Sequence, residues 1–303
     1  MINILKEVII INSRQILTNI NWFPGHMAKT RRMIQDSLSL VDIVVELRDA
    51  RIPMSSSNPE LHKWVGNKKR MVVLNKCDTA DPRITALWLK YYKEQGVTAI
   101  ATDSKTGKGI PQFLPAVREE LSEVLERRAN KGMAGRPLRM MVVGIPNVGK
   151  SSFINKLARE KRAKVEDRPG VTRGKQWVTV SRDVELLDMP GVLWPKFEDP
   201  AVGEKLAFTG AVKDQVLDVE LLAMRLLSWM SREYPEKLTE RYKVTGDETA
   251  ELEPYDLLCL VGRKRGMLMG GGEIDTLRAA TMVLDEYRGG KLGKISLELP
   301  EDQ

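Results

Sequence analysis

Cysteine is scarce in this chain of 303 residues, which contains only Cys77 and Cys259. The two lie far apart, so they form neither the dense framework of a disulfide-stabilised miniprotein nor the close spacing of a metal motif. Histidine is equally rare, with His26 and His62 alone. His62 stands outside any motif, and we expect it on the surface. This cysteine usage is typical of a reducing compartment, and we expect a cytoplasmic protein.

Long hydrophobic runs are also missing. The longest run near the start, residues 8–11, is bounded by Lys6, Glu7, Asn12 and Arg14, and it is too short for a membrane span or the core of a secretory signal. The composition, 42% hydrophobic and 29% charged, is that of a globular protein that folds in water without a membrane partner. A single hydrophobic core stops growing near this length, so we expect two folded units.

The net charge of +7 is unevenly distributed along the chain. Residues 1–200 carry +12, whereas residues 201–303 carry −5. Such a basic region favours a polyanionic partner through attraction to phosphates, although a basic surface that keeps the protein soluble explains the charge equally well. Charge alone leaves both interpretations open.

Short β-branched runs alternate with longer helical stretches from Asn21 onward. This alternation predicts an α/β fold with a mostly parallel sheet and helices on both faces. The expected strands are residues 41–47, 71–74, 97–101, 140–144, 177–180 and 184–187. The stretch 126–139, with five basic residues, two glycines and a proline, is expected to be a flexible connector.

The strand pattern disappears after Pro195 and gives way to helical periodicity. Residues 215–232 place Leu217, Leu221, Met224 and Leu227 on one stripe, and residues 273–287 do the same with Ile274, Leu277, Thr281 and Leu284. We therefore predict an extension over residues 1–20, an α/β domain over residues 21–198 and a mostly helical domain over residues 199–303.

Residues 144–151 read G-I-P-N-V-G-K-S and fit the phosphate-binding P-loop, G-x-x-x-x-G-K-[ST]. The motif follows an expected strand and opens a helix, a setting that makes a chance glycine loop a poor alternative. Its backbone N–H groups would face phosphate oxygens, Lys150 would neutralise the β- and γ-phosphates during binding and catalysis, and Ser151 would bind Mg²⁺. The remaining expected nucleotide contacts here are Asn147, Val148, Gly149 and Ser152.

Residues 188–191, D-M-P-G, follow another expected strand, 37 residues after Ser151. A P-loop protein places here the aspartate that holds the magnesium shell, Asp188, and the glycine that senses the γ-phosphate, Gly191. Thr172 lies between the two motifs and could complete the metal shell with its hydroxyl. An ordinary turn threonine is the alternative for Thr172.

Residues 75–78, N-K-C-D, follow the strand at 71–74 and have the guanine-specifying form N-K-x-D. The Asp78 carboxylate can accept both the ring N–H and the exocyclic amino group of guanine, which separates GTP from ATP. Asn75, Lys76 and Cys77 complete this loop, and a plain surface turn is the alternative. Residues 103–105, Asp103, Ser104 and Lys105, follow the next strand and have the form of the second base-binding loop.

The order of these motifs is unusual for a GTPase. The guanine-binding loops precede the P-loop and the switch in the chain, so we predict a circularly permuted GTPase domain. Permutation leaves the pocket intact, because the pocket needs loops gathered at strand ends and not a particular chain order. It does change the connections, since the switch at residues 188–191 now leads directly into the helical domain.

The chain resembles the circularly permuted ribosome-assembly GTPases. The resemblance rests on the run N-W-F-P-G-H-M-A-K at 21–29, D-A-R-I-P at 49–53 and the three motifs at 75–78, 144–151 and 188–191. It implies a GTP-hydrolysing cytoplasmic factor that acts late in maturation of the large ribosomal subunit. Such a factor binds ribosomal RNA and proteins of the precursor and leaves when GTP is hydrolysed. Residues 1–20 lie outside the resemblance.

The position after Gly191, where many GTPases have a glutamine that orients the attacking water, is Val192. An isopropyl group can neither donate nor accept a proton, so the isolated enzyme is expected to be slow. The resemblance implies that His26, on a loop that docks on the ribosomal subunit, takes this role. The alternative is that His26 only stabilises a turn. The resemblance also implies that Asn147 binds K⁺. The alternative is that Asn147 only caps the loop.

Three functions remain to be separated by experiment. The first is a GTPase, monomeric away from the ribosome, that assembles the large subunit. The second is an RNA-binding module in which GTP acts as a structural switch with negligible turnover. The third, an ATPase acting on RNA or small molecules, is opposed by Asp78. The basic stretch 156–175, with 8 Lys or Arg against 3 Asp or Glu, is expected to contribute to subunit binding.

Overall fold

The computed structural model describes residues 24–133, 135–160, 175–193, 199–249 and 252–300. These residues fall into two compact units, the α/β unit of residues 24–193 with 296–300, and the helical unit of residues 199–295. The predicted helical domain ran to residue 303, and the structure corrects this end. Residues 296–300 group with the α/β unit because they bond to it, as when Leu297 N donates to Arg51 O at 2.8 Å.

The α/β unit is built on one six-stranded sheet with the order β3-β2-β1-β4-β6-β5. All neighbouring strands pair in parallel except β5 and β6, which form an antiparallel hairpin. The strands are β1 (Ile43–Asp49), β2 (Lys69–Asn75), β3 (Thr98–Ala101), β4 (Leu138–Gly144), β5 (Gln176–Ser181) and β6 (Val184–Asp188). Each expected strand is therefore confirmed within two residues at its ends.

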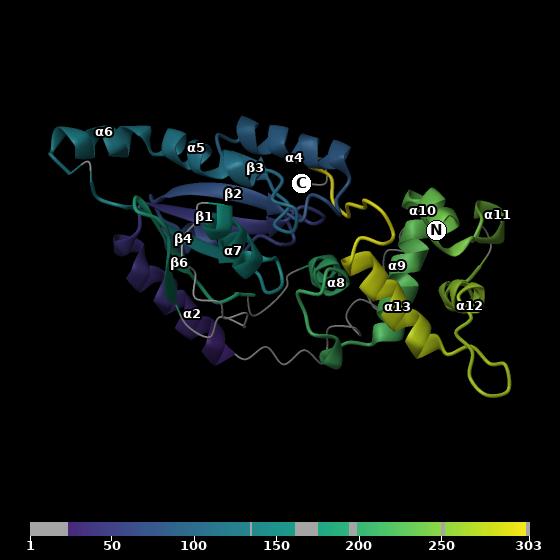
Figure 1. Ribbon diagram of the computed structural model, residues 1–303. Helices are drawn as coiled ribbons and strands as arrows, with labels where there is room; N and C mark the ends of the chain where they lie inside the picture. Colours follow the sequence, from purple (N-terminus) through teal and green to yellow (C-terminus); the bar gives the residue numbers. More distant parts are fainter. Residues whose placement is uncertain (1–23, 134, 161–174, 194–198, 250–251, 301–303) are drawn as a thin grey trace. The chain divides into compact units, whose positions relative to one another are not determined.

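Helices cover both faces of this sheet, as predicted (Figure 1). Val44 of β1 shares one face with Met141 of β4, and this face packs against Ile34 and Trp64. On the opposite side, Phe113 and Phe153 stack edge to face with ring centroids 5.0 Å apart. The helices of the unit are α2 (Pro24–Ser37), η1 (Leu38–Leu40), α3 (Leu61–Val65), α4 (Pro82–Glu94), α5 (Ile110–Glu120), α6 (Ser122–Asn130) and α7 (Lys150–Glu160).

The connector expected at residues 126–139 is shorter than predicted, because both of its ends belong to regular structure. Helix α6 runs to Asn130, and β4 begins at Leu138. The basic side chains that suggested a solvated linker include Arg128, which pairs with Asp42, the residue before β1. Its long stem and charge anchor the helix instead of keeping it in solvent.

The helical unit contains α8 (Pro200–Phe208), η2 (Asp214–Val216), α9 (Val219–Glu233), α10 (Pro235–Tyr242), α11 (Gly246–Thr249), α12 (Pro254–Lys264) and α13 (Thr276–Arg288). Asp218 and Asp275 cap α9 and α13 by accepting the backbone N–H groups of Leu221 and Arg278. No helix among the residues described is long and apolar enough to cross a membrane.

The buried faces of α9 and α13 differ from the predicted stripes. In α9 the buried residues are Leu222, Ala223, Leu226, Leu227 and Met230, and in α13 Ala279, Ala280, Val283, Leu284, Glu286 and Tyr287. Leu277 of the predicted stripe is 57% exposed. The small residues are buried because α12 and α13 approach closely: a Cβ at Gly262 would lie 3.3 Å from the Ala279 Cβ.

Candidate nucleotide-binding site

The four predicted motifs lie at one edge of the sheet. Asn75 ends β2, Asp188 ends β6, residues 145–149 follow β4, and residues 102–107 follow β3. These strands are parallel, so their carboxyl ends share an edge, and the loops gather there although their order in the chain is permuted. Figure 1 shows this arrangement of strand ends.

Asn75 joins three of these loops. Its Nδ2 donates to the Val148 carbonyl of the P-loop at 2.9 Å, and its Oδ1 accepts from Thr102 Oγ1 at 3.2 Å and from Ser104 Oγ at 2.7 Å. The side chain is 1% exposed, so each bond is made away from water and none is readily replaced by a solvent contact. Asn75 therefore fixes the guanine loops and the P-loop relative to one another.

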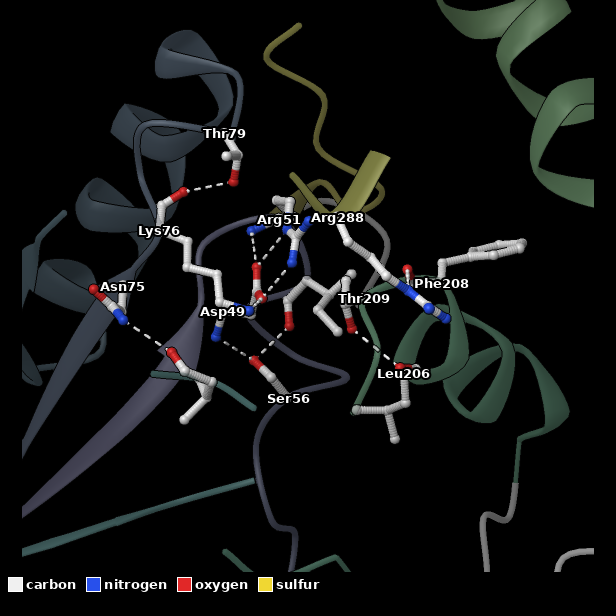
Figure 2. Close-up of polar contacts among 12 residues, drawn as sticks. Asp49, Arg51, Ser56, Asn75, Lys76, Thr79, Leu206, Phe208, Thr209 and Arg288 are labelled. Carbon is white, nitrogen blue, oxygen red and sulfur yellow. Dashed lines mark hydrogen bonds and ion pairs between the residues drawn. The ribbon is translucent and has the colours of Figure 1, made fainter. Parts of the chain in front are cut away.

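Lys76 and Asp49 form an ion pair at the start of the guanine loop. Lys76 Nζ lies 3.1 Å from Asp49 Oδ2, and Arg51 binds both oxygens of the same carboxylate (Figure 2). Burial works to raise the pKa of Asp49, but Arg51 and Lys76 outweigh burial and hold this pKa well below its usual range. Burial lowers the pKa of Lys76, and Asp49 partly offsets that effect. Asp49 thus remains an anion that holds Lys76 in place.

The P-loop has the backbone that its motif requires. Gly149 has φ +97°, and a Cβ there would meet the Asn75 amide at 2.5 Å, so only glycine fits. Asn147 also has a positive φ, 57°, and its side chain is exposed. Val148 is buried, whereas Ser151 and Ser152 lie exposed in the first turn of α7. Helix α7 therefore presents its N-terminal turn, where phosphate groups bind favourably.

Lys150 lies folded under the P-loop. Its Nζ donates to the carbonyls of Gly144 at 3.0 Å and Ile145 at 2.9 Å, and the residue is 8% exposed. Burial lowers the pKa of Lys150 to about 8, while Asp188 acts in the opposite direction. Carbonyl groups only partly compensate a buried ammonium, so a bound anion would stabilise its charge.

Gly191 approaches the P-loop closely. A Cβ at Gly191 would lie 2.9 Å from Pro146 Cα and 3.2 Å from Lys150 Nζ. Asp188, at the end of β6, is 7% exposed. The next residue after Gly191, Val192, donates its N–H to Gly144 O at 3.2 Å and buries its side chain in the core with Ile34 of α2. The switch backbone thus lies directly beside the phosphate loop.

The second base loop is held by its own aspartate. Asp103 accepts the backbone N–H of Lys105 at 2.8 Å and the hydroxyl of Thr106 at 2.5 Å. Burial acts to raise the pKa of Asp103, but these hydrogen bonds outweigh it and lower the pKa. Ser104 is half-buried and Lys105 exposed. Asp103 is therefore a loop-shaping residue, and the backbone of Ser104 and Lys105 remains the part expected to meet the base.

Asp78 and Cys77 lie half-buried in the loop after Asn75. Cys77 N donates to Thr102 O at 3.1 Å, which ties the two base loops together. Burial raises the pKa of the Cys77 thiol. A partly exposed Asp78 carboxylate is compatible with the predicted contact to guanine.

Two predicted site residues, Thr172 and His26, have no described side chain. Thr172 lies outside the described residues. The backbone of His26 lies in the first turn of α2, which begins at Pro24, so its expected placement on a loop is corrected. Proline suits this position because its ring presets a helical φ and its missing N–H is not needed there. Of the His26 side chain the structure gives no position.

Comparisons with known proteins identify the family. A family model described as 50S ribosome-binding GTPase matches residues 139–254. A relative named ribosome biogenesis GTPase A, from Bacillus cereus, is 48% identical and aligns over 93% of this chain and 95% of its own. The relative of the same name from Priestia megaterium is 49% identical over 93% of this chain and 98% of its own. The chain belongs to the ribosome biogenesis GTPase A family.

A solved structure agrees with this family. GNP-bound YlqF from T. maritima is similar with a TM-score of 0.63 and 29% identity, over 90% of this chain and 99% of that one. The predicted fold class is confirmed: a permuted P-loop GTPase domain with a helical region. The chain is therefore a GTPase that binds guanine nucleotide and acts in ribosome biogenesis.

Some residues that shape the site were not assigned a role from the sequence. Asp49 and Arg51 belong to the D-A-R-I-P run that carries the family resemblance, but the ion pair with Lys76 depends on the parallel pairing of β1 and β2. Their signal was a charged pair directly after a buried strand. Ser296 and Glu298 gave no local signal, because their partners lie more than two hundred residues earlier in the chain.

Proposed function

We propose that this GTPase acts late in maturation of the large ribosomal subunit, binds the precursor in its GTP state and leaves after hydrolysis. The observation that supports it most is the linkage of Asn75 to Val148 and Ser104, which couples base-binding and phosphate-binding loops in one rigid arrangement. The names of the matching family and of the relatives, a 50S ribosome-binding GTPase and ribosome biogenesis GTPase A, support the ribosomal partner. The positive charge of residues 1–200 suits ribosomal RNA.

The nucleotide contacts follow from the loops. Asp78 recognises guanine, the backbone at Ser104 and Lys105 supports the base, and Lys150 with the N–H groups at Val148 to Ser152 binds the phosphates. Gly191 carries no Cβ and lies beside Lys150, which supports the proposal that its N–H senses the γ-phosphate. The same contacts should persist with GDP except at Gly191, which makes the residues after it sensitive to hydrolysis.

The donor set near the P-loop fits Mg²⁺ bound together with a nucleotide. Ser151 supplies a hydroxyl at the start of α7 and Asp188 a buried carboxylate, with Thr172 proposed as a third ligand. Among the described residues no cluster of three His, Cys, Asp or Glu side chains could hold a metal by itself. Mg²⁺ commonly binds through one or two protein groups and the phosphates, and it neutralises phosphate charge. Asn147, exposed in the P-loop, is proposed to bind K⁺.

Hydrolysis is proposed to be slow until the precursor subunit is bound. Val192 is buried in the core with Ile34 and has no polar group for the attacking water. Helix α2 carries both Ile34 and His26, and their separation of eight positions corresponds to about 12 Å along the helix. We propose that docking on the subunit moves α2 and brings His26 toward the switch. Ile34 of the same helix already packs with Met189 of the switch in the core. The factor is proposed to be a monomer in the cytoplasm when it is not on the ribosome.

The observation at Val192 also supports the second candidate, an RNA-binding module with GTP as a structural switch and negligible turnover. The two functions differ in whether precursor subunits accelerate hydrolysis. Co-sedimentation with precursor large subunits, in the presence of a non-hydrolysable GTP analogue or GDP, tests the proposed binding cycle. We expect retention with the analogue and release with GDP; equal retention would contradict the cycle.

Variants of the basic stretch 156–175 test the proposed subunit binding in a second way. Residues 161–174 lie outside the described residues, so the proposal rests on their charge. Charge reversal in this stretch should weaken subunit binding and flatten its dependence on salt. Unchanged binding and salt dependence would leave the stretch with a role in solubility alone.

A further inference from the structure

The described chain ends with a segment that returns to the α/β unit. This C-terminal segment, residues 296–300, follows directly after Ile295 of the helical unit. Ser296 and Glu298 are 3% and 4% exposed. Polar side chains this deeply buried need dedicated partners, and both have them in loops near the nucleotide site.

Glu298 holds the loop that follows β1. Its carboxylate accepts the backbone N–H of Met54 at 2.8 Å and of Ser55 at 3.1 Å, and it also accepts the Ser55 hydroxyl. The Glu298 carbonyl accepts Trp88 Nε1 of α4 at 3.0 Å. One residue at the chain end therefore joins the β1 loop to the helix that follows the guanine loop.

The neighbours of Glu298 are connected by hydrogen bonds and an ion pair to both ends of the guanine loop. Leu297 N donates to Arg51 O at 2.8 Å, and the Arg51 side chain holds Asp49, the partner of Lys76. Figure 2 shows this connection from Arg51 through Asp49 to Lys76. At the other end, Ser296 Oγ accepts the N–H of Asp81, the residue that caps α4.

Asp78 lies between these two supports. Lys76 is fixed on one side of it through Asp49 and Asp81 on the other side through Ser296. The direction of a carboxylate that makes two hydrogen bonds to one base depends on the backbone at both ends of its loop. A shift of a few tenths of an ångström weakens both bonds together.

We propose that the C-terminal segment is a positioning element of the guanine site, with Glu298 as its principal positioning residue. It sets the orientation of Asp78 through the β1 loop and through Asp81, and it contacts no nucleotide itself. The inference rests on the proposed role of Asp78 in guanine recognition.

The test compares the affinities of the full-length protein for GDP and IDP, since inosine lacks the exocyclic amino group of guanine. Glu298→Gln removes the negative charge and replaces one of the two acceptor oxygens with an N–H₂ group, so Met54 and Ser55 keep a single side-chain oxygen as their acceptor. Ser296→Ala removes the acceptor for Asp81 and is the milder change if the first variant folds poorly. Either variant should lower the preference for GDP over IDP by about threefold or more.

Glu120→Gln is the matched control. Glu120 also accepts a hydroxyl, Thr98 Oγ1 at 2.6 Å, and pairs with Lys69, but it lies at the amino-terminal ends of β2 and β3. Its preference for GDP should equal that of the wild type. Titration stoichiometry gives the folded fraction, so a merely destabilised variant would bind fewer nucleotides with an unchanged GDP to IDP ratio.

Asp78→Asn separates failure of this inference from failure of the proposed site. If Asp78→Asn removes the GDP preference while Glu298→Gln and Ser296→Ala both keep the wild-type ratio, the positioning role is overturned and the guanine site stands. If Asp78→Asn also leaves the ratio unchanged, the guanine assignment fails and the positioning role fails with it.

Discussion

The Asn75 side chain donates to the carbonyl of Val148 across 2.9 Å and thereby connects the guanine loop to the P-loop. Asn75 ends β2, whereas Val148 lies in the loop that follows β4, and these two strands are separated in the sheet by β1. Gly149 lets the P-loop come this close, because any Cβ there would meet the Asn75 amide. The connection holds the guanine loop and the P-loop together although they are far apart in the permuted chain.

Asn75→Asp tests this connection. It keeps the oxygen that accepts from Thr102 and Ser104 but removes the donor to Val148, so we expect a loss of stability of roughly 1–3 kcal/mol together with weaker GDP binding. Thermal unfolding and nucleotide titration measure the two effects. Asn130→Asp, an exposed change at the end of α6, is the control and should alter neither.

Asp78→Asn should change base preference instead of abolishing binding. Xanthine presents a carbonyl where guanine has its amino group, so an amide at position 78 should favour XDP relative to GDP. Competition titrations with the two nucleotides measure the preference. An unchanged ratio would exclude Asp78 from the base site.

The lowered pKa of Lys150 predicts that the affinity for nucleotide depends on pH. With a pKa of about 8 in the empty protein, the side chain loses its charge as pH rises from 7 to 9, and phosphate binding must then recover a proton. Affinity for GDP should fall by about tenfold at pH 9. Lys150→Arg keeps its charge, and its affinity should stay flat over the same range; a parallel fall in both proteins would assign the effect to another group.

The lowered pKa of Lys150 also determines how the stability of the folded protein changes with pH. The unfolded Lys150 binds a proton up to about pH 10.5, whereas the folded one releases it near 8, so this group makes the fold more stable as pH rises between these values. Nucleotide binding should abolish this rise in stability, since bound phosphate keeps Lys150 protonated in the folded state as well. Thermal unfolding at pH 7.5 and 9.5, with and without GDP, measures the difference.

The strands and the phosphate and guanine motifs could be predicted from the sequence because each is a local pattern. A β-branched run such as residues 71–74 followed by N-K-C-D specifies both a strand and the loop at its end. The buried faces of α9 and α13 could not be predicted this way, because Ala279 is buried and Leu277 exposed through the close approach of Gly262. The role of Glu298 depends entirely on contacts distant in sequence.

His26→Ala tests the proposal that His26 takes part in GTP hydrolysis when the protein is bound to the ribosomal subunit. If it orients the attacking water after docking, His26→Ala should retain GTP affinity and subunit binding but lose roughly a hundredfold of the stimulated rate. His62→Ala is the matched control and should behave like the wild type. A variant that binds subunits poorly, with normal basal hydrolysis, would assign His26 to docking.

We propose that precursor large subunits activate this GTPase. Single-turnover hydrolysis of GTP, measured with and without those subunits, tests this proposal most directly. With Val192 buried and no glutamine after Gly191, the protein alone should hydrolyse GTP slowly, and saturating precursor subunits should raise the rate by roughly a hundredfold or more. Lys150→Ala should show neither the basal nor the stimulated rate. Equal rates with and without precursor subunits would contradict the account.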